Sequence, residues 1–222
     1  MTNVHNTIIR GLNSIYLQAP HVAAHDYKSF IGYSLGWHRF TEHHHYSEEE
    51  YFFKGLHEKI GSEVMSASQA EHRKFHDGMD YYHAYLTSLG GKEDQFDSKK
   101  LLEIIDSFSG PLYTHLTNEI GALLDLEKLG QTKVVMDCWA EGLKKGTAAL
   151  TFNDLFVLMP FAFFAHDYTY ENGLHANFPP LPRPVRFLLR RLTSLWYYSY
   201  WKFSPCDTAG VPRKKLYALG GN

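Results

Sequence analysis

Histidine and glutamate residues recur in this sequence at spacings that suit metal ligation. Three pairs are each four residues apart: His44 and Glu48 in "HHHYSEEEYFF", His72 and His76 in "EHRKFH", and His115 and Glu119 in "HLTNE". On a helix, residues at this spacing lie one turn apart on the same face. Imidazoles combined with carboxylates suit iron or manganese, whereas magnesium and calcium prefer oxygen ligands alone. The three pairs therefore predict a transition-metal site.

The pair His44 and Glu48 falls on an aromatic stripe that is expected to face a helical core. At 100° per residue, the stripe contains Tyr33, Trp37, Phe40 and Tyr51. A carboxylate buried there costs several kcal/mol unless it is paired or bound to a metal. His45 and Glu49 point about 100° away on the same wheel and are expected to lie outside the ligand set. The alternative interpretation is that the whole run is a solvated charged face of a long helix.

The other pairs make the metal interpretation stronger than the surface one. The pair His72 and His76 and the pair His115 and Glu119 each share a helical face with apolar residues. In the same way, His5 shares a face with Ile8, Ile9 and Leu12. Five histidines and two glutamates are too many ligands for one zinc ion, which takes four. Seven ligands divide naturally between two metal ions with both carboxylates bridging them.

Four long helices are expected to position these residues. Capping residues and glycines delimit helices over 3–19, 26–60, 68–89 and 98–128, with a kink or break at Gly110-Pro111 in the last. No segment alternates with the period of a β-strand. Short connections between such helices favour an antiparallel, up-down-up-down four-helix bundle, so the fold class is all-α.

The last part of the chain has a different composition. Residues 131–222 are rich in aromatic residues and contain the proline-rich stretch "NFPPLPRPVRF", with helices expected over 133–145 and 184–200. The prediction is a metal-binding domain at 1–130 and a mostly helical extension at 131–222 that packs on it. The basic and aromatic faces of "RFLLRRLTSLWYYSYWKF" could touch a membrane surface, but we expect this stripe to pack inward.

Bulk composition excludes several classes of function. The net charge is −2, which does not favour a nucleic-acid partner, although eight Lys/Arg and one Asp follow residue 182. The longest apolar run, "LFVLMPFAFFA", is too short to span a bilayer. Cys138 and Cys206 are interpreted as free thiols in a reducing, cytoplasmic compartment, with a single disulfide as the alternative.

The ligand pattern resembles the hemerythrin family in its broader hemerythrin-like "HHE" form. The matching pieces are "HNTIIR" at His5, "HHYSEEEYFF", "EHRKFH" and "HLTNE", which together span residues 1–130. "FAHDYTYENG" and "WKFSPCD" are similar to the C-terminal extension of fungal hemerythrin-like proteins. The resemblance implies two iron ions with an oxo or hydroxo bridge. His72, His76 and His115 would hold one iron, His5 and His44 the other, and Glu48 and Glu119 would bridge them.

Two classes of function are compatible with this resemblance, and no catalytic residue is assigned. The second iron would have one imidazole fewer and an open position, where O₂ is expected to bind. The aromatic extension favours an oxygenase or oxidase that acts on a small organic substrate. The imidazole-rich ligand set favours a reversible O₂ or iron binder, such as a carrier, store or sensor. A descendant of the fold that has lost its metal is the third interpretation.

Overall fold

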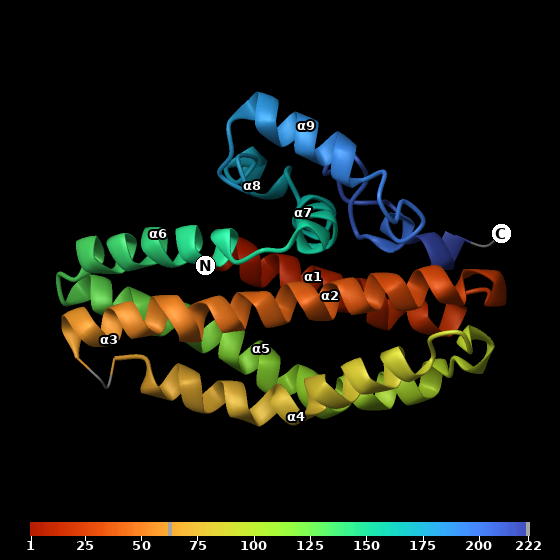
Figure 1. The fold of residues 1–222 in the computed structure, drawn as a ribbon, viewed down its shortest axis with the longest axis horizontal. Coiled ribbons are helices and arrows are strands. Elements are labelled where there is room, and N and C mark those ends of the chain that lie inside the picture. The colour runs from red at the N-terminus through yellow and green to blue at the C-terminus, as the bar shows by residue number, and fades with distance from the viewer. Residues whose placement is uncertain (62–63, 221–222) are drawn as a thin grey trace. The chain divides into compact units, whose positions relative to one another are not determined.

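The computed structural model describes residues 1–61 and 64–220, and within them the chain is built from helices (Figure 1). The only β-type pairing in these residues is an isolated bridge between Cys206 and Pro212. The helices are α1 (Thr2–Gln18), α2 (Tyr27–Ser47), α3 (Lys54–Ile60), α4 (Ser66–Ser88), α5 (Ser98–Lys128), α6 (Thr132–Ala148), α7 (Phe152–Ala165), α8 (Tyr170–Gly173) and α9 (Arg183–Thr193). Short 3₁₀ turns occur at Ala19–His21, Ala24–Asp26, Glu93–Gln95, Trp201–Phe203 and Tyr217–Gly220. The all-α prediction is confirmed.

The helix ends lie where the sequence signals place them. Asp97 caps α5, because its Oδ1 accepts the backbone N–H groups of Lys99 and Lys100 at 2.9 and 3.2 Å. The helical run that contains α3 ends at Gly61, and α5 is followed by Gly130, both with the positive φ that glycine adopts readily (134° and 74°). These local signals explain why the first four expected helices match the observed ones to within two residues at each end.

Four elements differ from expectation, wholly or in part. A π-helical segment, η3 (Glu48–Phe53), joins α2 to α3 without a break in the helical run. Helix α5 continues through Pro111 without the break that was one of the two expected outcomes, while a kink there stays a prediction, and the buried residues Phe108 and Leu112 flank the proline. Helix α9 stops at Thr193 instead of continuing to residue 200, and α7, with Pro160 inside it, was not expected as a helix.

Contacts group the chain into two compact units, whose boundaries fall within α2, α4 and α5 and between α6 and α7. The first unit comprises 1–40, 82–103 and 151–222, and the second comprises 41–81 and 104–150. The expected domain boundary at Gly130 therefore falls inside the second unit. Among the described residues, none of the helices is both long and apolar enough to cross a membrane.

The first unit has an aromatic core between α1, α7 and the start of α2. Tyr33 stacks on Phe161 with ring centroids 5.6 Å apart, and Trp37 donates from its indole nitrogen to the carbonyl of Ile8 at 2.9 Å. Helix α7 begins with a capping box formed by Thr151 and Asp154. The carboxylate of Asp154 also pairs with Arg39 at 2.9 Å.

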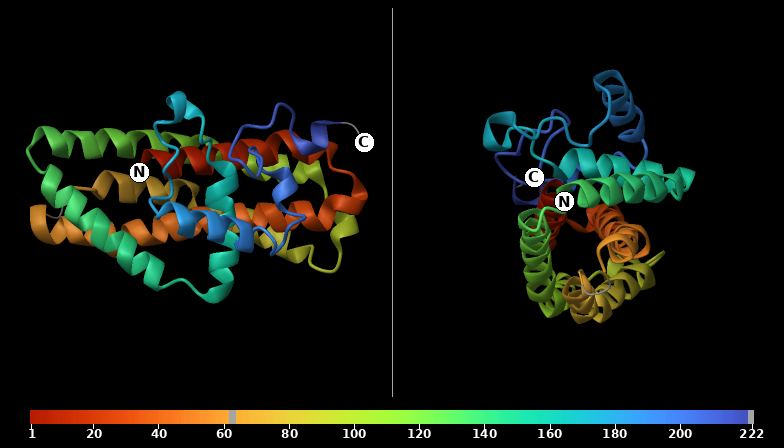
Figure 2. Two further views of the ribbon diagram at one scale, coloured as in Figure 1. Left: turned by 90° about the horizontal axis from the view of Figure 1, so that it is seen from above. Right: turned by 90° about the vertical axis from the view of Figure 1, so that its left-hand side faces the viewer.

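The second unit holds the expected ligand residues. In the right-hand view of Figure 2, the run from α2 to α3, the start of α4 and the end of α5 are seen nearly end-on. Helix α6 packs against η3 and α3. This contact is close because α6 presents Gly142 and Gly146, and a Cβ at Gly146 would lie 2.8 Å from Oγ of Ser47. The start of the extension thus supports the helical run that carries Glu48.

Candidate metal centre

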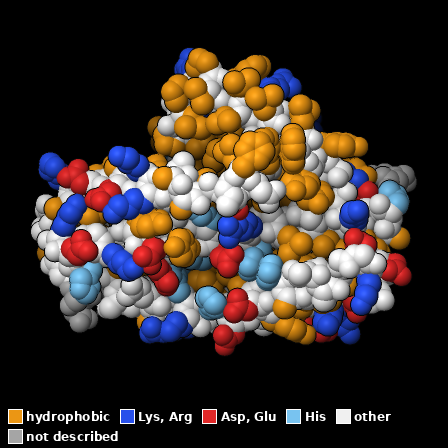
Figure 3. Space-filling view, in the orientation of Figure 1, with side chains coloured by type: hydrophobic (Ala, Val, Ile, Leu, Met, Phe, Trp, Pro, Cys, Tyr) orange, Lys and Arg blue, Asp and Glu red, His pale blue; other side chains and the backbone are white. Residues whose placement is uncertain are grey.

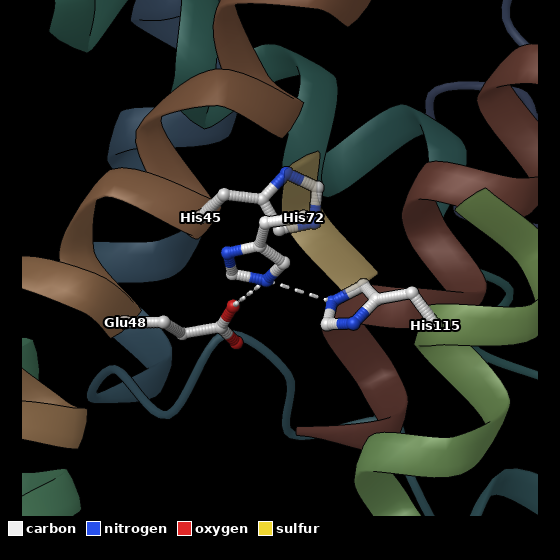
Figure 4. Close-up of side chains that lie close together, drawn as sticks. All are labelled: His45, Glu48, His72 and His115. Atoms are coloured by element: carbon white, nitrogen blue, oxygen red, sulfur yellow. Dashed lines mark hydrogen bonds and ion pairs between the residues drawn. The ribbon is translucent and has the colours of Figure 1, made fainter. Parts of the chain in front are cut away.

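Four side chains from three segments of the second unit meet in its core (Figure 4). His45 comes from α2, Glu48 from the start of η3, His72 from α4 and His115 from α5. Each residue offers one imidazole nitrogen or carboxylate oxygen, and these four atoms all lie within 4.8 Å of one another. All four residues are buried. Buried imidazoles and a carboxylate at this spacing are a donor set that suits a transition-metal ion, such as iron, manganese or zinc.

His72 and His115 face each other through their Nε2 atoms, which are 3.0 Å apart. On the other side of the His72 ring, Nδ1 lies 2.6 Å from Oε1 of Glu49. Nδ1 of His115 lies 3.6 Å from Oε2 of Glu71, and Oε1 of Glu71 accepts a hydrogen bond from the amide of Asn118 at 2.7 Å. Each imidazole therefore has a carboxylate behind it and directs its Nε2 into the core. Carboxylates in this position orient metal-binding histidines and fix their tautomer.

This arrangement fits a cation between the two imidazoles. When Nδ1–H of His72 donates to Glu49, the Nε2 of the neutral ring presents a lone pair to His115. If His115 donated a proton from Nε2, its own Nδ1 lone pair would face the carboxylate of Glu71. A metal ion bound to both Nε2 atoms satisfies all of these groups. Two adjacent ligands of one octahedral ion, each about 2.1 Å from it, are separated by about 3.0 Å.

Two buried carboxylates lie beside these imidazoles. Oε2 of Glu48 is 3.9 Å from Nε2 of His72, and Oε2 of Glu119 is 4.0 Å from Nε2 of His115. Burial, together with the nearby charge of Glu119, raises the pKa of Glu48 well above its usual range. On its other oxygen, Glu48 lies 3.0 Å from Nε2 of His44. A bound cation would relieve the cost of burying these charges together.

The structure brings together five of the seven expected ligands: His44, Glu48, His72, His115 and Glu119. The sixth, His5, is buried on α1 in the first unit, and its role as a ligand stays a prediction. The seventh, His76, does not belong to the buried group. Its side chain is 69% exposed, and its Nδ1 lies 3.2 Å from Asp80.

The placement of His76 is a correction with a clear physical reason. The buried stripe of α4 runs through His72, Phe75, Met79, Tyr82 and Leu86. His76 lies about 100° from Phe75 on the helical wheel and beyond His72, on the side away from the middle of that stripe. The expected stripe followed histidines along the helix, whereas the observed one follows the apolar residues.

His45 was expected to point away from the site and instead lies in it. Its ring centroid is 4.7 Å from that of His72 and 5.1 Å from that of Phe75. Both His44 and His45 are buried, so more of the circumference of α2 is buried here than a single inward stripe allows. Glu49 stays outside the group of four, as expected, but contacts His72 from behind. The sequence signal that could have identified Glu71 and Asn118 is weak, because their contact joins two different helices.

Comparison with known proteins gives one informative relative. The chain is 31% identical over 219 residues to the dimeric xanthone biosynthesis cluster protein R11 of Cryptosporiopsis sp. (strain 8999), an alignment that covers 98% of this chain and 81% of the relative. No family model matches the chain. No solved structure matches it.

Proposed function

This chain belongs to the same protein family as the dimeric xanthone biosynthesis cluster protein R11, and from its own buried histidines and glutamates we propose that it is a hemerythrin-like di-iron protein that uses O₂ to oxidise a small organic molecule. The observation that carries the proposal is the buried group of His45, Glu48, His72 and His115. Because the relative is named as a xanthone biosynthesis cluster protein, the proposal includes a role for this chain in secondary metabolism. Aromatic compounds related to xanthones are therefore the substrate class to test first.

In the proposed centre, the ligands would follow the hemerythrin-like pattern with one exchange. His45 would take the place that the resemblance gave to His76 and would hold an iron together with His72 and His115. His44, Glu48 and Glu119 would keep the ligand roles that the resemblance implies, and the role of His5 stays a prediction. The proposal includes the finer arrangement of the fold, an up-down-up-down bundle of α1, the run from α2 to α3, α4 and α5. The helical content and the short connections support this arrangement.

The residues around the centre have definable roles in this proposal. A bound di-iron pair would supply the electrons that reduce O₂ and an open position for it. Glu49 and Glu71 hold the His72 and His115 rings in the orientation that directs Nε2 inward. Phe75 packs on the rings of His45 and His115, with centroids 5.1 and 5.5 Å away, and limits the access of water. A dry wall of this kind protects reactive species from side reactions with solvent.

The second candidate is a reversible O₂ or iron binder without turnover. The abundance of imidazoles in the ligand set favours it, because oxygenase-type bundles use four carboxylates and two histidines. The packing of α6 on η3 and α3 is also compatible with an extension that covers the protein without building a substrate cavity. Both candidates require the same metal centre and differ only in the fate of bound O₂.

Iron binding is tested first, and the reaction with O₂ is tested separately afterwards. The full chain is loaded anaerobically with Fe²⁺, freed of excess metal and assayed for iron content, with the His45→Ala variant in parallel. We expect two irons per wild-type chain and a lower content in the variant. A wild-type chain that retains no iron after loading refutes both candidates.

The loaded protein is then exposed to O₂ with and without xanthone-type phenols. Consumption of O₂ coupled to conversion of an added compound supports the enzyme. An absorption change that is reversed when O₂ is removed, with no product formed, supports the reversible binder and rejects turnover.

A further inference from the structure

Helix α9 presents its apolar face outward. Val185, Leu188 and Leu192 have the i, i+3, i+7 spacing of one helical stripe, and all three are exposed. This face was expected to pack inward. In Figure 3, hydrophobic side chains gather on the part of the surface where Figure 1 places α7 and α9.

The opposite face of α9 attaches it to the first unit. The guanidinium group of Arg190 lies over the rings of Tyr168 and Phe164, 5.1 and 5.7 Å from their centroids. Its Nη2 donates to the carbonyl of Asp207 at 3.4 Å, and Thr193 is buried on the same side. Helix α9 packs mainly against α7. The side of α9 that carries Arg190 and Thr193 therefore holds the helix in place, whereas Leu188 and Leu192 are exposed.

The residues that come after α9 extend the exposed apolar surface. Leu195, Trp196 and Tyr198 are all exposed in the turn after Thr193. Arg183 and Arg191 are also exposed on α9 and add positive charge to this segment. Over residues 183–222 the sequence has eight Lys/Arg and one Asp. We call Val185, Leu188, Leu192, Leu195, Trp196 and Tyr198 the α9 surface.

We propose that the α9 surface docks onto an anionic lipid bilayer, with α9 lying in the plane of the interface. An interfacial helix of this kind has leucine and aromatic residues on the face that enters the lipid and arginines that contact the headgroups. Tryptophan and tyrosine favour the same depth in a membrane. The excess of positive charge in this segment complements a surface of anionic lipids, which attracts each nearby Lys or Arg. With 11 residues, α9 is too short to span a bilayer.

The experiment measures sedimentation of the full chain with vesicles of phosphatidylcholine alone or mixed with phosphatidylserine. The Leu188→Ser/Leu192→Ser variant removes two leucines that are 55% and 50% exposed, and Leu124→Ser/Leu143→Ser removes two that are 51% and 49% exposed elsewhere. We expect binding to the mixed vesicles by the wild type and the control variant. Binding of the α9 variant is expected to be weaker by roughly tenfold or more, since it lacks two leucines that would be buried in the lipid.

A second variant, Arg183→Gln/Arg191→Gln, leaves the apolar residues in place. It is expected to lose the preference for phosphatidylserine and the sensitivity of binding to salt. The proposal is overturned if the wild type does not sediment with mixed vesicles, or if both leucine variants bind equally. It is also overturned if the wild type forms a dimer that Leu188→Ser/Leu192→Ser abolishes while vesicle binding is unchanged, because a second copy of the chain would then cover the α9 surface.

Discussion

His45 and His76 differ in what surrounds their imidazole rings, and this difference leads to the first prediction. His45 is buried against His72 and Phe75, whereas His76 is exposed beside Asp80. His45→Ala is expected to lower the iron content of the loaded protein, because a donor is lost from the buried group. His76→Ala should leave the iron content unchanged. Metal analysis of both variants after identical loading checks this, and a loss of iron only in His76→Ala would contradict the placement of both residues.

The carboxylate behind His72 leads to the second prediction at the scale of single residues. Glu49 contacts Nδ1 of His72 at 2.6 Å, and replacement by glutamine removes the charge but retains the shape. We expect Glu49→Gln to weaken iron affinity by about 10–100-fold, the usual effect of losing such a partner. Glu50→Gln is the matched control, because Glu50 pairs with Lys54 on the surface and does not contact the site. Equal affinities of the two variants, measured by competition with a chelator, would show that Glu49 does not orient His72.

At the scale of elements, helix ends are easier to predict than helix faces. Asp97, Gly61 and Gly130 act on their own backbone, so their effect is visible in the local sequence. The inward face of α4 depends on which neighbours pack against it, and a helical wheel of α4 alone allowed a stripe through His76. The π-helical segment after Ser47 and the course of α5 through Pro111 depend in the same way on contacts made by other segments. Most of the buried group of histidines and glutamates was therefore predictable, whereas the burial of His45 in place of His76 was not.

The close approach of α4 and α5 leads to a prediction about packing. A Cβ added at Gly78 would lie 2.6 Å from Cβ of Phe108, so Gly78→Ala must push the two helices apart. We expect a loss of about 1–3 kcal/mol of unfolding free energy, and weaker iron binding because His72 and His115 lie on these helices. Gly121→Ala is the control on α5, where nothing lies within 4 Å, and it should stabilise the protein by about 0.5–1 kcal/mol. Chemical denaturation measures both effects, and a stable Gly78→Ala variant with normal iron affinity would contradict the argument.

The start of α7 leads to a prediction about acid stability. The Arg39 guanidinium and the hydrogen bonds from Thr151 lower the pKa of Asp154 from 3.8 to about 2. Because the pKa is lower in the folded state, this carboxylate stabilises the fold above pH 3.8, and the contribution is lost as the pH falls towards about 2. Asp154→Asn should therefore be less stable than the wild type at neutral pH, and the difference should shrink as the pH falls through this window. Melting temperatures of the two proteins across the range check this, and a difference that does not change with pH would contradict it.

At the scale of the whole molecule, charge and chemistry are segregated along the chain. The candidate ligands within the second unit lie between residues 44 and 119, whereas the basic segment and the α9 surface come after residue 182 in the first unit. The sequence showed this segregation directly, because most histidines lie in the first part of the chain and an excess of Lys and Arg follows residue 182. It did not show that the apolar stripe of α9 faces outward, because an amphipathic pattern does not indicate which face is covered.

Metal binding should stabilise the whole chain, since the ligands come from segments far apart in the sequence. Iron bound by His45, Glu48, His72 and His115 would join α2, η3, α4 and α5, and the unfolded chain does not hold these residues together. At a free iron concentration of 100 times the dissociation constant, the expected gain is about 2.7 kcal/mol. For a chain of this size, that gain corresponds to a rise of about 5–10 °C in melting temperature. Calorimetry under anaerobic conditions should show the rise with Fe²⁺ and its loss when a chelator is added, while His45→Ala should show a smaller rise. Identical melting curves with and without iron at saturating concentration would mean that these residues do not form a metal centre, whatever the iron content of the purified protein.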